Sequence, residues 1–339
     1  MVERLGMNYL KNELYQADVR TVVESIDGFD FFKKKKIAIL GATGLIGSFL
    51  VDCFLYANTH KNADAEIYAV SRKREHLVDR FDAERENLHF VEKDVISFEL
   101  DDKIDIIVHA ASYAYPKAFR ENPVETMLGN MLGTYRVMET ARKNPGCRVL
   151  YISSGEVQTH MDNLSVRACY PISKQAGETL CLSYIQEYGI DAVIARPSHT
   201  YGGNATARDN RATAQFIAKA AKDKDIILNS PGTQIRSFTY IADCAAALLT
   251  LLARGKTGHM YGVASDDICS IRQFAAHCAD VSHTQVLTNE ASSIGKAEMS
   301  PIKEQIINND ALKALGWSPL FTIERGIEHS IIIQKQMGY

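Results

Sequence analysis

The stretch from residue 36 to residue 57, KIAILGATGLIGSFLVDCFLYA, constrains the fold more than any other part of the chain. Four apolar residues, 37–40, run into Gly41, Gly44 and Gly47, and an apolar helical pattern follows them. A short branched apolar run that enters a glycine turn and then a helix predicts a buried strand, a tight turn and a helix. This unit opens an alternating series of strands and helices.

The series continues for about 150 residues. Helical patterns, including 124–143 and one from about Pro171, separate the apolar strand patterns EIYAVS, LHFVEKDV, DIIVHAAS, RVLYISS and DAVIARPS. Strands that alternate with helices predict an α/β fold with a doubly wound parallel sheet. These strands are apolar on both faces, as expected when helices cover both sides of the sheet.

The pattern divides the chain into three parts. Apolar residues at helical spacing within 9–26 predict an N-terminal helical extension, 1–32. The strand–helix series forms a domain at 33–197, and we expect 234–255 to return to it. Beyond Ser198 polar loops mix with helices, the last of them just before Gly316. We interpret 198–233 and 256–339 as a smaller, partly interleaved C-terminal lobe.

Composition excludes several classes of protein. A net charge of −3 gives no basic excess, so no nucleic-acid partner is expected, and the lysines at 33–36 are interpreted as a solvated flank. No run of 18 apolar residues exists, so no membrane span is expected. The N-terminus lacks the apolar region of a signal peptide. Seven cysteines without a CxxC pair predict reduced thiols, no metal site and a cytoplasmic location.

The glycine triplet has the features of a dinucleotide site. Glycine permits the tight turn and the close approach of the backbone to a pyrophosphate, which lies at the helix N-terminus. Gly41, Gly44 and Gly47 follow a strand and open a helix, so we predict a Rossmann-type NAD(P)-binding domain. An NAD site usually has an acid at the end of the second strand. Here Ser71 and Arg72 occupy that end, which leaves NAD and NADP open.

Other positions at the strand ends are expected to line the cofactor. The first turn contributes Thr43, Leu45 and Ile46. The ends of the third and fourth strands contribute Asp94, Val95, Ala110, Ala111 and Ser112, and a later strand ends at Pro197. We therefore predict NAD as the cofactor, with NADP as the alternative.

A tyrosine and a lysine form the candidate catalytic pair. Tyr170 and Lys174 lie four residues apart, which places them on one face of a helix. A lysine ammonium about 4–6 Å away, together with a nicotinamide cation, favours the phenolate and makes Tyr170 a base. The pair follows a strand that ends in Ser153 and Ser154.

Together GATGLIG, YISSGEV, YPISK and RPSHTYG resemble the extended short-chain dehydrogenase/reductase family that acts on nucleotide sugars. The resemblance implies that Tyr170 removes the hydroxyl proton at sugar carbon 4 while hydride passes to the nicotinamide. Lys174 would hold the ribose and tune Tyr170, Ser154 would hydrogen-bond the reacting oxygen, and Asn130 would support the lysine. Members of the family usually form homodimers through the helices that carry these residues.

Three segments, 109–130, 167–181 and 209–244, most resemble UDP-glucuronate decarboxylases, and dTDP-glucose 4,6-dehydratases come next. Arg236 matches an arginine placed against the substrate diphosphate, and Arg211 matches another basic residue of the substrate lobe. His199 stands where the family has asparagine. Tyr115 is a further candidate for substrate contact.

Residues 154–156 bear on the reaction. The resemblance implies that Glu156 handles the proton at carbon 5, whereas dehydratases carry an aspartate at the position of Gly155. Glycine transfers no proton, which counts against 4,6-dehydration. Decarboxylation of a UDP-uronic acid is the leading prediction. The alternatives are carbon 4 epimerisation, dehydration, the reaction of an NADPH-dependent keto-sugar reductase, and a non-catalytic role as a dinucleotide sensor. The loop between Glu156 and Tyr170 is shorter than in related enzymes, which leaves the pocket wider or lets another segment, 113–117, close it.

Overall fold

The computed structural model describes residues 8–158, 165–289 and 302–338. Its main feature is a seven-stranded sheet with the order β10-β6-β5-β4-β1-β2-β3, and every neighbouring pair is parallel. The strands are β1 (Lys36–Leu40), β2 (Glu66–Ser71), β3 (Leu88–Glu92), β4 (Ile106–His109), β5 (Arg148–Ile152), β6 (Asp191–Pro197) and β10 (Met260–Val263). The predicted doubly wound parallel sheet is confirmed.

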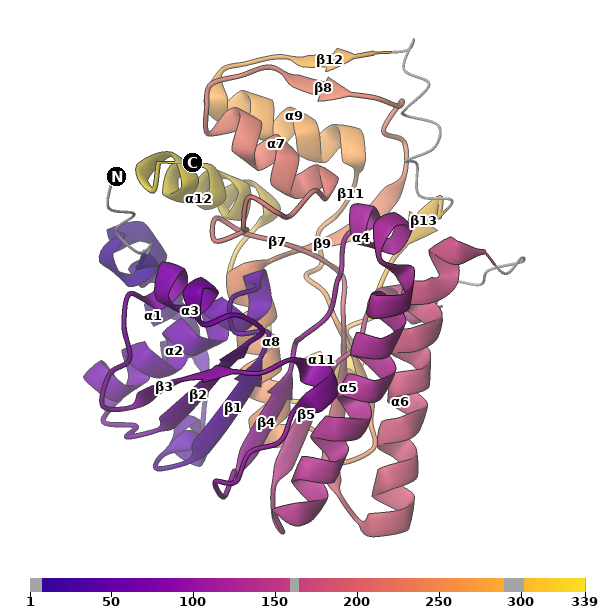
Figure 1. The fold of residues 1–339 in the computed structure, drawn as a ribbon. Coiled ribbons are helices and arrows are strands. Elements are labelled where there is room, and N and C mark those ends of the chain that lie inside the picture. Colours follow the sequence, from indigo (N-terminus) through magenta and orange to yellow (C-terminus); the bar gives the residue numbers. More distant parts are fainter. Residues whose placement is uncertain (1–7, 159–164, 290–301, 339) are drawn as a thin grey trace.

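Helices cover both faces of this sheet (Figure 1). Along β1 the side chains alternate between two cores: Ile37 and Ile39 join one, while Ala38 and Leu40 join the other. The first core includes residues of α1 (Glu13–Ser25), α2 (Leu45–Lys61), α3 (Arg74–Phe81) and α8 (Ile241–Arg254), and the second includes residues of α5 (Pro123–Lys143) and α6 (Cys169–Tyr188). Burial on both faces explains the continuous apolar runs in the sequence.

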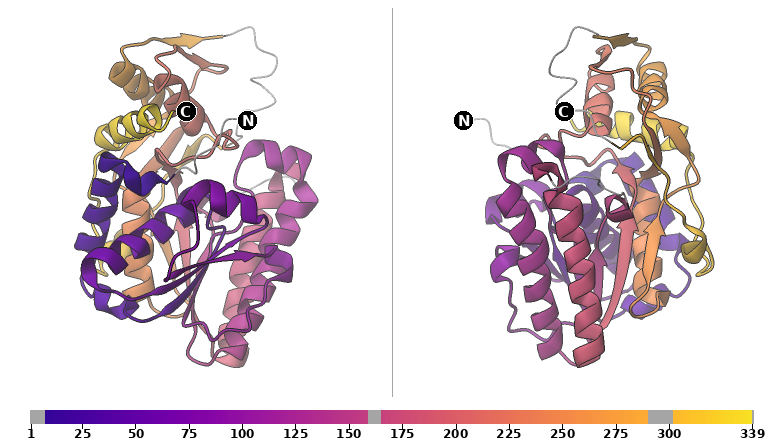
Figure 2. Two further views of the ribbon diagram at one scale, coloured as in Figure 1. Left: turned by 60° about the vertical axis from the view of Figure 1, so that its left-hand side comes forward. Right: turned by 90° about the vertical axis from the view of Figure 1, so that its right-hand side faces the viewer.

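A smaller lobe lies at one end of the main sheet (Figures 1 and 2). Its strands are β7 (His199–Tyr201), β9 (Ile235–Tyr240), β11 (Ile268–Ser270) and β13 (Glu304–Gln305) in one sheet, and β8 (Ile226–Leu228) and β12 (Val286–Thr288) in another. Its helices are α7 (Ala212–Ala220), α9 (Ile271–Ser282) and α12 (Ile323–Gln336), and short α11 (Asp310–Lys313) follows β13. Within the described ranges, no helix has the length and apolarity needed to cross a bilayer.

Short elements complete the fold. Helix α4 (Pro116–Glu121) follows β4, and single helical turns are η1 (Tyr9–Lys11), η2 (Phe29–Phe32), η3 (Val95–Ser97), η4 (Gly155–Gln158) and η5 (Val166–Ala168).

Some elements differ from the sequence-based expectation. Strand β10 joins the main sheet beside β6, although it lies within 256–339. Strand β9 belongs to the lobe sheet, and within 234–255 only α8 packs against strands of the main sheet. The helix before Gly316 is the four-residue α11, and the longer α12 was not expected. Gly262 interrupts the apolar run of β10, MYGV, and glycine is depleted in strands, so the pattern there is weak.

Helix α1 joins the two parts of the molecule. It packs against α2 and α8 of the main domain and against α12 of the lobe. The buried carboxylate of Asp18 accepts a hydrogen bond from the Tyr240 hydroxyl (2.5 Å) and lies 2.8 Å from Nδ1 of His329. Nδ2 of Asn12, which caps α1, donates to Gln336 at 2.8 Å. The predicted N-terminal helix is therefore a bridge between the main domain and the lobe.

Candidate active site

The glycine turn between β1 and α2 has a shape that only glycine permits. Gly41 has a φ of +79°, and a Cβ there would lie 2.8 Å from the carbonyl oxygen of Ala110. A Cβ on Gly47 would lie 2.2 Å from the carbonyl oxygen of Gly41. Gly44 caps α2 without a side-chain hydrogen bond and is exposed. The first N–H groups of α2 are therefore available to an anion, as a pyrophosphate site requires.

The other predicted cofactor residues lie around this turn. Because β1 stands between β2 and β4, the order of the sheet reverses beside the turn, and ligands bind at such reversals. The other predicted cofactor residues lie at the carboxyl ends of β1, β2, β3, β4 and β6 or in the segments that follow these strands. They are Thr43, Leu45, Ile46, Ser71, Arg72, Asp94, Val95, Ala110, Ala111, Ser112 and Pro197. The fold thus collects these positions at one edge of the sheet.

The predicted catalytic residues meet at the end of β5. Tyr170 and Lys174 are buried on α6, and Nζ of Lys174 donates to the carbonyl oxygen of Ile152 at 2.7 Å. The Ser154 side chain lowers the pKa of Tyr170, and its hydroxyl oxygen accepts a hydrogen bond from the backbone N–H of Glu156 at 3.1 Å. Nδ2 of Asn130, on α5, donates to the hydroxyl of Ser173 at 2.9 Å. Asn130 therefore supports the turn of α6 that carries the lysine.

The electrostatics of this pair differ from the sequence-based expectation. Burial, then Glu156, raises the pKa of Tyr170 to about 12, although Ser154 and two arginines act in the opposite direction. Burial lowers the pKa of Lys174 to about 7. The protein's own groups therefore keep the phenol protonated, because the loss of hydration outweighs the nearby positive charge. The positive nicotinamide ring is the further group that this chemistry requires.

Two residues that the sequence did not reveal hold Glu156 and Tyr170. Nη2 of Arg167 donates to Oε2 of Glu156 at 2.8 Å. The Arg167 guanidinium lies 4.6 Å from the ring centre of Phe119, and that ring stacks on Tyr170 with 4.7 Å between centres. Phe119 belongs to α4, so the segment after β4 covers the catalytic tyrosine. Neither Arg167 nor Phe119 belongs to a sequence pattern that would identify it as a site residue. The one signal available was that Arg167 lies three residues before Tyr170.

Gly155 is buried against a distant part of the chain. A Cβ on Gly155 would lie 2.6 Å from Cδ1 of Ile307 and 3.3 Å from the carbonyl oxygen of Pro197. Ile307 thus fills the space that a side chain at position 155 would need. The shortened loop noted in the sequence includes 159–164, which lie outside the described residues.

The predicted substrate residues lie on the lobe side. Arg211 is hydrogen-bonded to Asp209 through Nε and Nη2, and its Nη1 donates to the carbonyl oxygen of Thr200 at 2.9 Å. Arg236 is buried, and its guanidinium donates to the carbonyl oxygens of Ile235 (2.7 Å) and Ile302 (2.6 Å). This arginine therefore also anchors the chain just before β13.

His199 and Tyr115 complete this side of the site. Burial, with the charges of Arg236 and Arg211, lowers the pKa of His199 to about 3, so this imidazole is neutral at pH 7. Tyr115 is partly exposed at the start of α4. Three arginines, 167, 211 and 236, influence Tyr170 or His199. Glu156 pairs with Arg167 and Asp209 pairs with Arg211, whereas Arg236 forms no ion pair with a carboxylate of the described residues. Such a site favours an anionic substrate.

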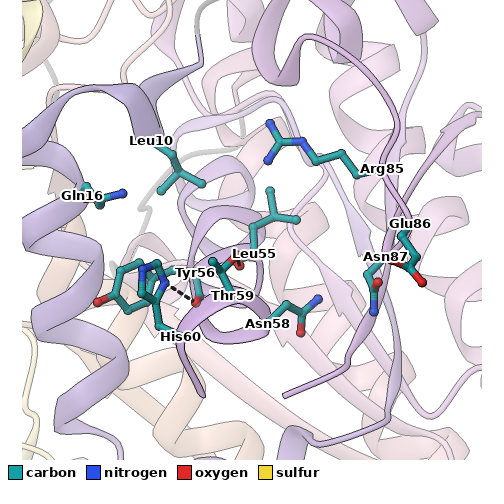
Figure 3. Close-up of a pocket in the computed structure, with 10 residues that line it drawn as sticks. All are labelled: Leu10, Gln16, Leu55, Tyr56, Asn58, Thr59, His60, Arg85, Glu86 and Asn87. Atoms are coloured by element: carbon teal, nitrogen blue, oxygen red, sulfur yellow. Dashed lines mark hydrogen bonds between the residues drawn. The ribbon is translucent and has the colours of Figure 1, made fainter. Parts of the chain in front are cut away.

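A separate hollow of about 260 Å³ lies away from these residues (Figure 3). Its lining comes from η1, α1, the end of α2 and the turn before β3, and the His60 ring stacks on Tyr56 there with 4.1 Å between centres. None of the predicted site residues lines it.

With this geometry in view, similarity to known proteins is informative. The family model described as "NAD dependent epimerase/dehydratase family" matches residues 37–264. The chain belongs to this family. The relatives described next are nucleotide-sugar enzymes of this family. The resemblance to nucleotide-sugar enzymes that the motifs indicate is therefore confirmed.

UDP-glucuronic acid decarboxylases are among the curated relatives of the chain. It is 28% identical over 313 residues to UDP-glucuronic acid decarboxylase 1 of Xenopus tropicalis, covering 88% of this chain and 72% of the relative. It is 30% identical over 309 residues to UDP-glucuronic acid decarboxylase 3 of Arabidopsis thaliana, covering 86% of each. The structure of a UDP-glucuronic acid 4-epimerase from Bacillus cereus with UDP-glucuronic acid and NAD superposes with a TM-score of 0.76 and 21% identity, covering 89% of this chain and 99% of that one.

The residues of this family member fit its NAD-dependent chemistry. The glycine turn has the close approaches that a pyrophosphate site needs, and α6 places Tyr170 and Lys174 beside the end of β5. The nucleotide would contact the turn residues 41–47 and the strand ends, and Lys174 would contact the ribose nearest the reacting ring.

Proposed function

We propose that the chain is a nucleotide-sugar decarboxylase that acts on a UDP-uronic acid through transient oxidation at sugar carbon 4. The observation that carries this proposal is the arrangement at 154–156. Glu156 is held by Arg167, while Ile307 fills the space beside Gly155 where a dehydratase would need an acid. The decarboxylase relatives support the same choice.

The residues have distinct roles in this reaction. Tyr170 takes the proton of the carbon 4 hydroxyl, and Ser154 holds that oxygen through a hydrogen bond. Bound NAD, held by the turn residues 41–47 and Lys174, would supply a reversible hydride acceptor for carbon 4. The resulting β-keto acid loses carbon dioxide, and Glu156 is proposed to relay the solvent proton that replaces it at carbon 5. Tyr170 then returns its proton to the carbon 4 oxygen.

The arginines account for the charge of such a substrate. A UDP-uronic acid carries a diphosphate and a carboxylate, both of which suit the planar guanidinium. Arg211 and Arg236 are proposed to face the diphosphate, with His199 as a neutral neighbour. The guanidinium of Arg236 binds only backbone carbonyls among its described contacts, so its charge is not cancelled by a carboxylate within the described residues.

A second candidate is a keto-sugar reductase that consumes NADPH. One observation favours it: Arg72, and no acid, follows Ser71 at the end of β2. The same Tyr170 would then protonate a carbon 4 ketone while hydride is delivered.

Incubation of the purified protein with UDP- and dTDP-sugars, followed by mass spectrometry, tests the proposal. We expect loss of carbon dioxide from a UDP-uronic acid without net consumption of NAD. Loss of water would indicate dehydration, an unchanged mass with altered stereochemistry would indicate epimerisation, and net oxidation of NADPH would indicate the reductase. Each of these results, or the absence of any turnover, would contradict the decarboxylase proposal.

We also propose that the chain is a homodimer. On α5, Val124, Leu128, Met131 and Tyr135 are exposed at helical spacing, and α6 exposes Ile172 beside them. Helices α5 and α6 lie side by side on the outer face of the molecule (Figure 2). An exposed apolar face of this size fits a second copy. Leu128→Glu is expected to give monomers in light scattering, and an unchanged mass would contradict the interface.

Two coarser proposals accompany these. The unpaired cysteines agree with a reducing, cytoplasmic compartment. The lobe formed by 198–233 and 256–339 is proposed to bind the sugar nucleotide, with 33–197 and α8 holding the cofactor.

A further inference from the structure

Four basic side chains gather where the adenosine half of the cofactor would lie. Arg72 and Lys73 follow β2, His76 lies in the first turn of α3, and Arg208 comes from the loop between β7 and α7. Nη2 of Arg208 lies 3.0 Å from Nε2 of His76. The Arg72 guanidinium is hydrogen-bonded to the Tyr113 hydroxyl and lies 4.8 Å from that ring centre. The lobe and the main domain both contribute to this basic cluster.

The four groups influence one another electrostatically. Burial lowers the pKa of His76, and Arg208, Lys73 and Arg72 lower it further. The main nearby acids are Asp94 and Glu125, which act on Arg72 from other elements, and Asp79, which acts on His76 from the same helix, α3. The side chain of Asp94 already accepts a hydrogen bond from the backbone of Ile96 at 3.1 Å.

Neighbouring arginines differ from this basic cluster because they are paired with carboxylates. Arg74 pairs with Glu84, and Arg80 pairs with Asp52. Arg72, Lys73 and Arg208 form no ion pair with a carboxylate of the described residues. These three cations are therefore free to meet an external anion.

The end of β2 lacks the group that selects a plain ribose. A carboxylate there accepts a hydrogen bond from the 2′-hydroxyl and repels a phosphate at the same position. Here the last residue of β2 is Ser71, which is small, uncharged and buried. Helix α3 follows at Arg74, and its N-cap residue Lys73 makes no side-chain hydrogen bond to the first N–H groups.

We propose that Arg72, Lys73, His76 and Arg208 bind a phosphate on the 2′ position of the adenosine ribose, so that the chain takes NADP(H) in preference to NAD(H). This inference rests on the proposed dinucleotide site and specifies its adenosine end. A guanidinium from the lobe and one from the main domain would hold the same phosphate, and the bound cofactor would tie the two parts together. NADP in this role still permits the redox-neutral reaction, because the hydride returns to the sugar.

Calorimetric titration of the purified chain tests the inference without turnover. NAD and NADP are compared, and 5′-ADP and 2′,5′-ADP are compared to isolate the adenosine end from the nicotinamide. We expect the 2′-phosphorylated member of each pair to bind about tenfold more tightly, as expected of charge-assisted hydrogen bonds. Added salt should reduce this ratio, because Arg72 and Arg208 are exposed.

Variants identify the groups responsible. Arg72→Ala and Arg208→Ala should each reduce the ratio several-fold, because each should weaken the binding of NADP more than that of NAD. Arg74→Ala is the matched control, because this neighbouring guanidinium is paired with Glu84, and it should keep the ratio. Thermal unfolding of each variant verifies the fold, and Lys73→Ala provides a second test at an exposed position.

The outcomes separate the two proposals. Tighter binding of NAD than of NADP, or equal binding, overturns the phosphate subsite and leaves the dinucleotide site intact. An Arg72→Ala variant that weakens NAD and NADP equally also overturns it, since the arginine would then only stack on adenine. Failure of both dinucleotides to bind removes the cofactor site itself and the proposed function with it.

Discussion

Replacement of Lys174 by methionine should make the protein more stable at low pH while it removes activity. The side chain is 2% exposed, and burial lowers its pKa from 10.5 to about 7. At about 1.4 kcal/mol per pKa unit, the charged form in the folded state costs roughly 5 kcal/mol at pH 6. The methionine variant has no buried charge and therefore avoids this loss of folding free energy. It also leaves the carbonyl oxygen of Ile152 without the bond from Nζ, which costs about 1–3 kcal/mol.

The sign of the pH dependence follows from proton binding. Between about pH 7 and pH 10.5 the unfolded chain holds a proton on this lysine that the folded chain lacks, so the stability of the wild type rises with pH. The cost of the buried lysine falls to roughly 2 kcal/mol at pH 9. Lys174→Met should therefore be more stable than the wild type by roughly 2–4 kcal/mol at pH 6 and nearly equal to it at pH 9.

Thermal unfolding of both proteins from pH 6 to pH 9, without added cofactor, measures this difference. Lys222→Met is the control, because Lys222 is exposed, and its difference from the wild type should not vary with pH. A difference for Lys174→Met that is constant across the range, or that grows toward pH 9, would refute the assignment of a buried lysine that loses its proton near neutral pH.

Three further changes test other parts of the molecule. Tyr170→Phe should abolish turnover while calorimetry shows nearly unchanged cofactor affinity; retained turnover would mean that another group is the base. Gly155→Asp should destabilise the fold by about 1–3 kcal/mol through overpacking, and Ile307→Ala in the same chain should recover part of that loss in denaturant titrations. Asp18→Ala should cost about 3 kcal/mol because it leaves buried partners unpaired, whereas the exposed Glu13→Ala should change little; equal effects would contradict the bridging role of α1.

The sequence predicts the fold well where patterns are local. Strand β2 has the predicted bounds, and the glycine turn, Tyr170 and Lys174 take their expected places, because each depends on neighbouring residues. Helix α12 was also within reach, since Ile323, Ile327 and Ile331 recur every four residues.

Contacts between distant segments are not predictable in this way. Ile307 meets Gly155 across about half of the chain, and Arg208 meets His76 from another part of the fold. Arg167 and Phe119 lie on short helical turns whose packing depends on the whole site. The pKa of Tyr170 also required the structure, because burial and charge oppose each other there.

The bridge made by α1 has a consequence for the order of folding. Asp18 contacts a residue 222 positions away and another 311 positions away, and Asn12 contacts a residue 324 positions away. During synthesis α1 can settle on α2 early, but its carboxylate has no partners until β9 and α12 have been made. The interface between lobe and main domain is therefore among the last to close, and a nascent chain exposes this buried acid for most of its synthesis.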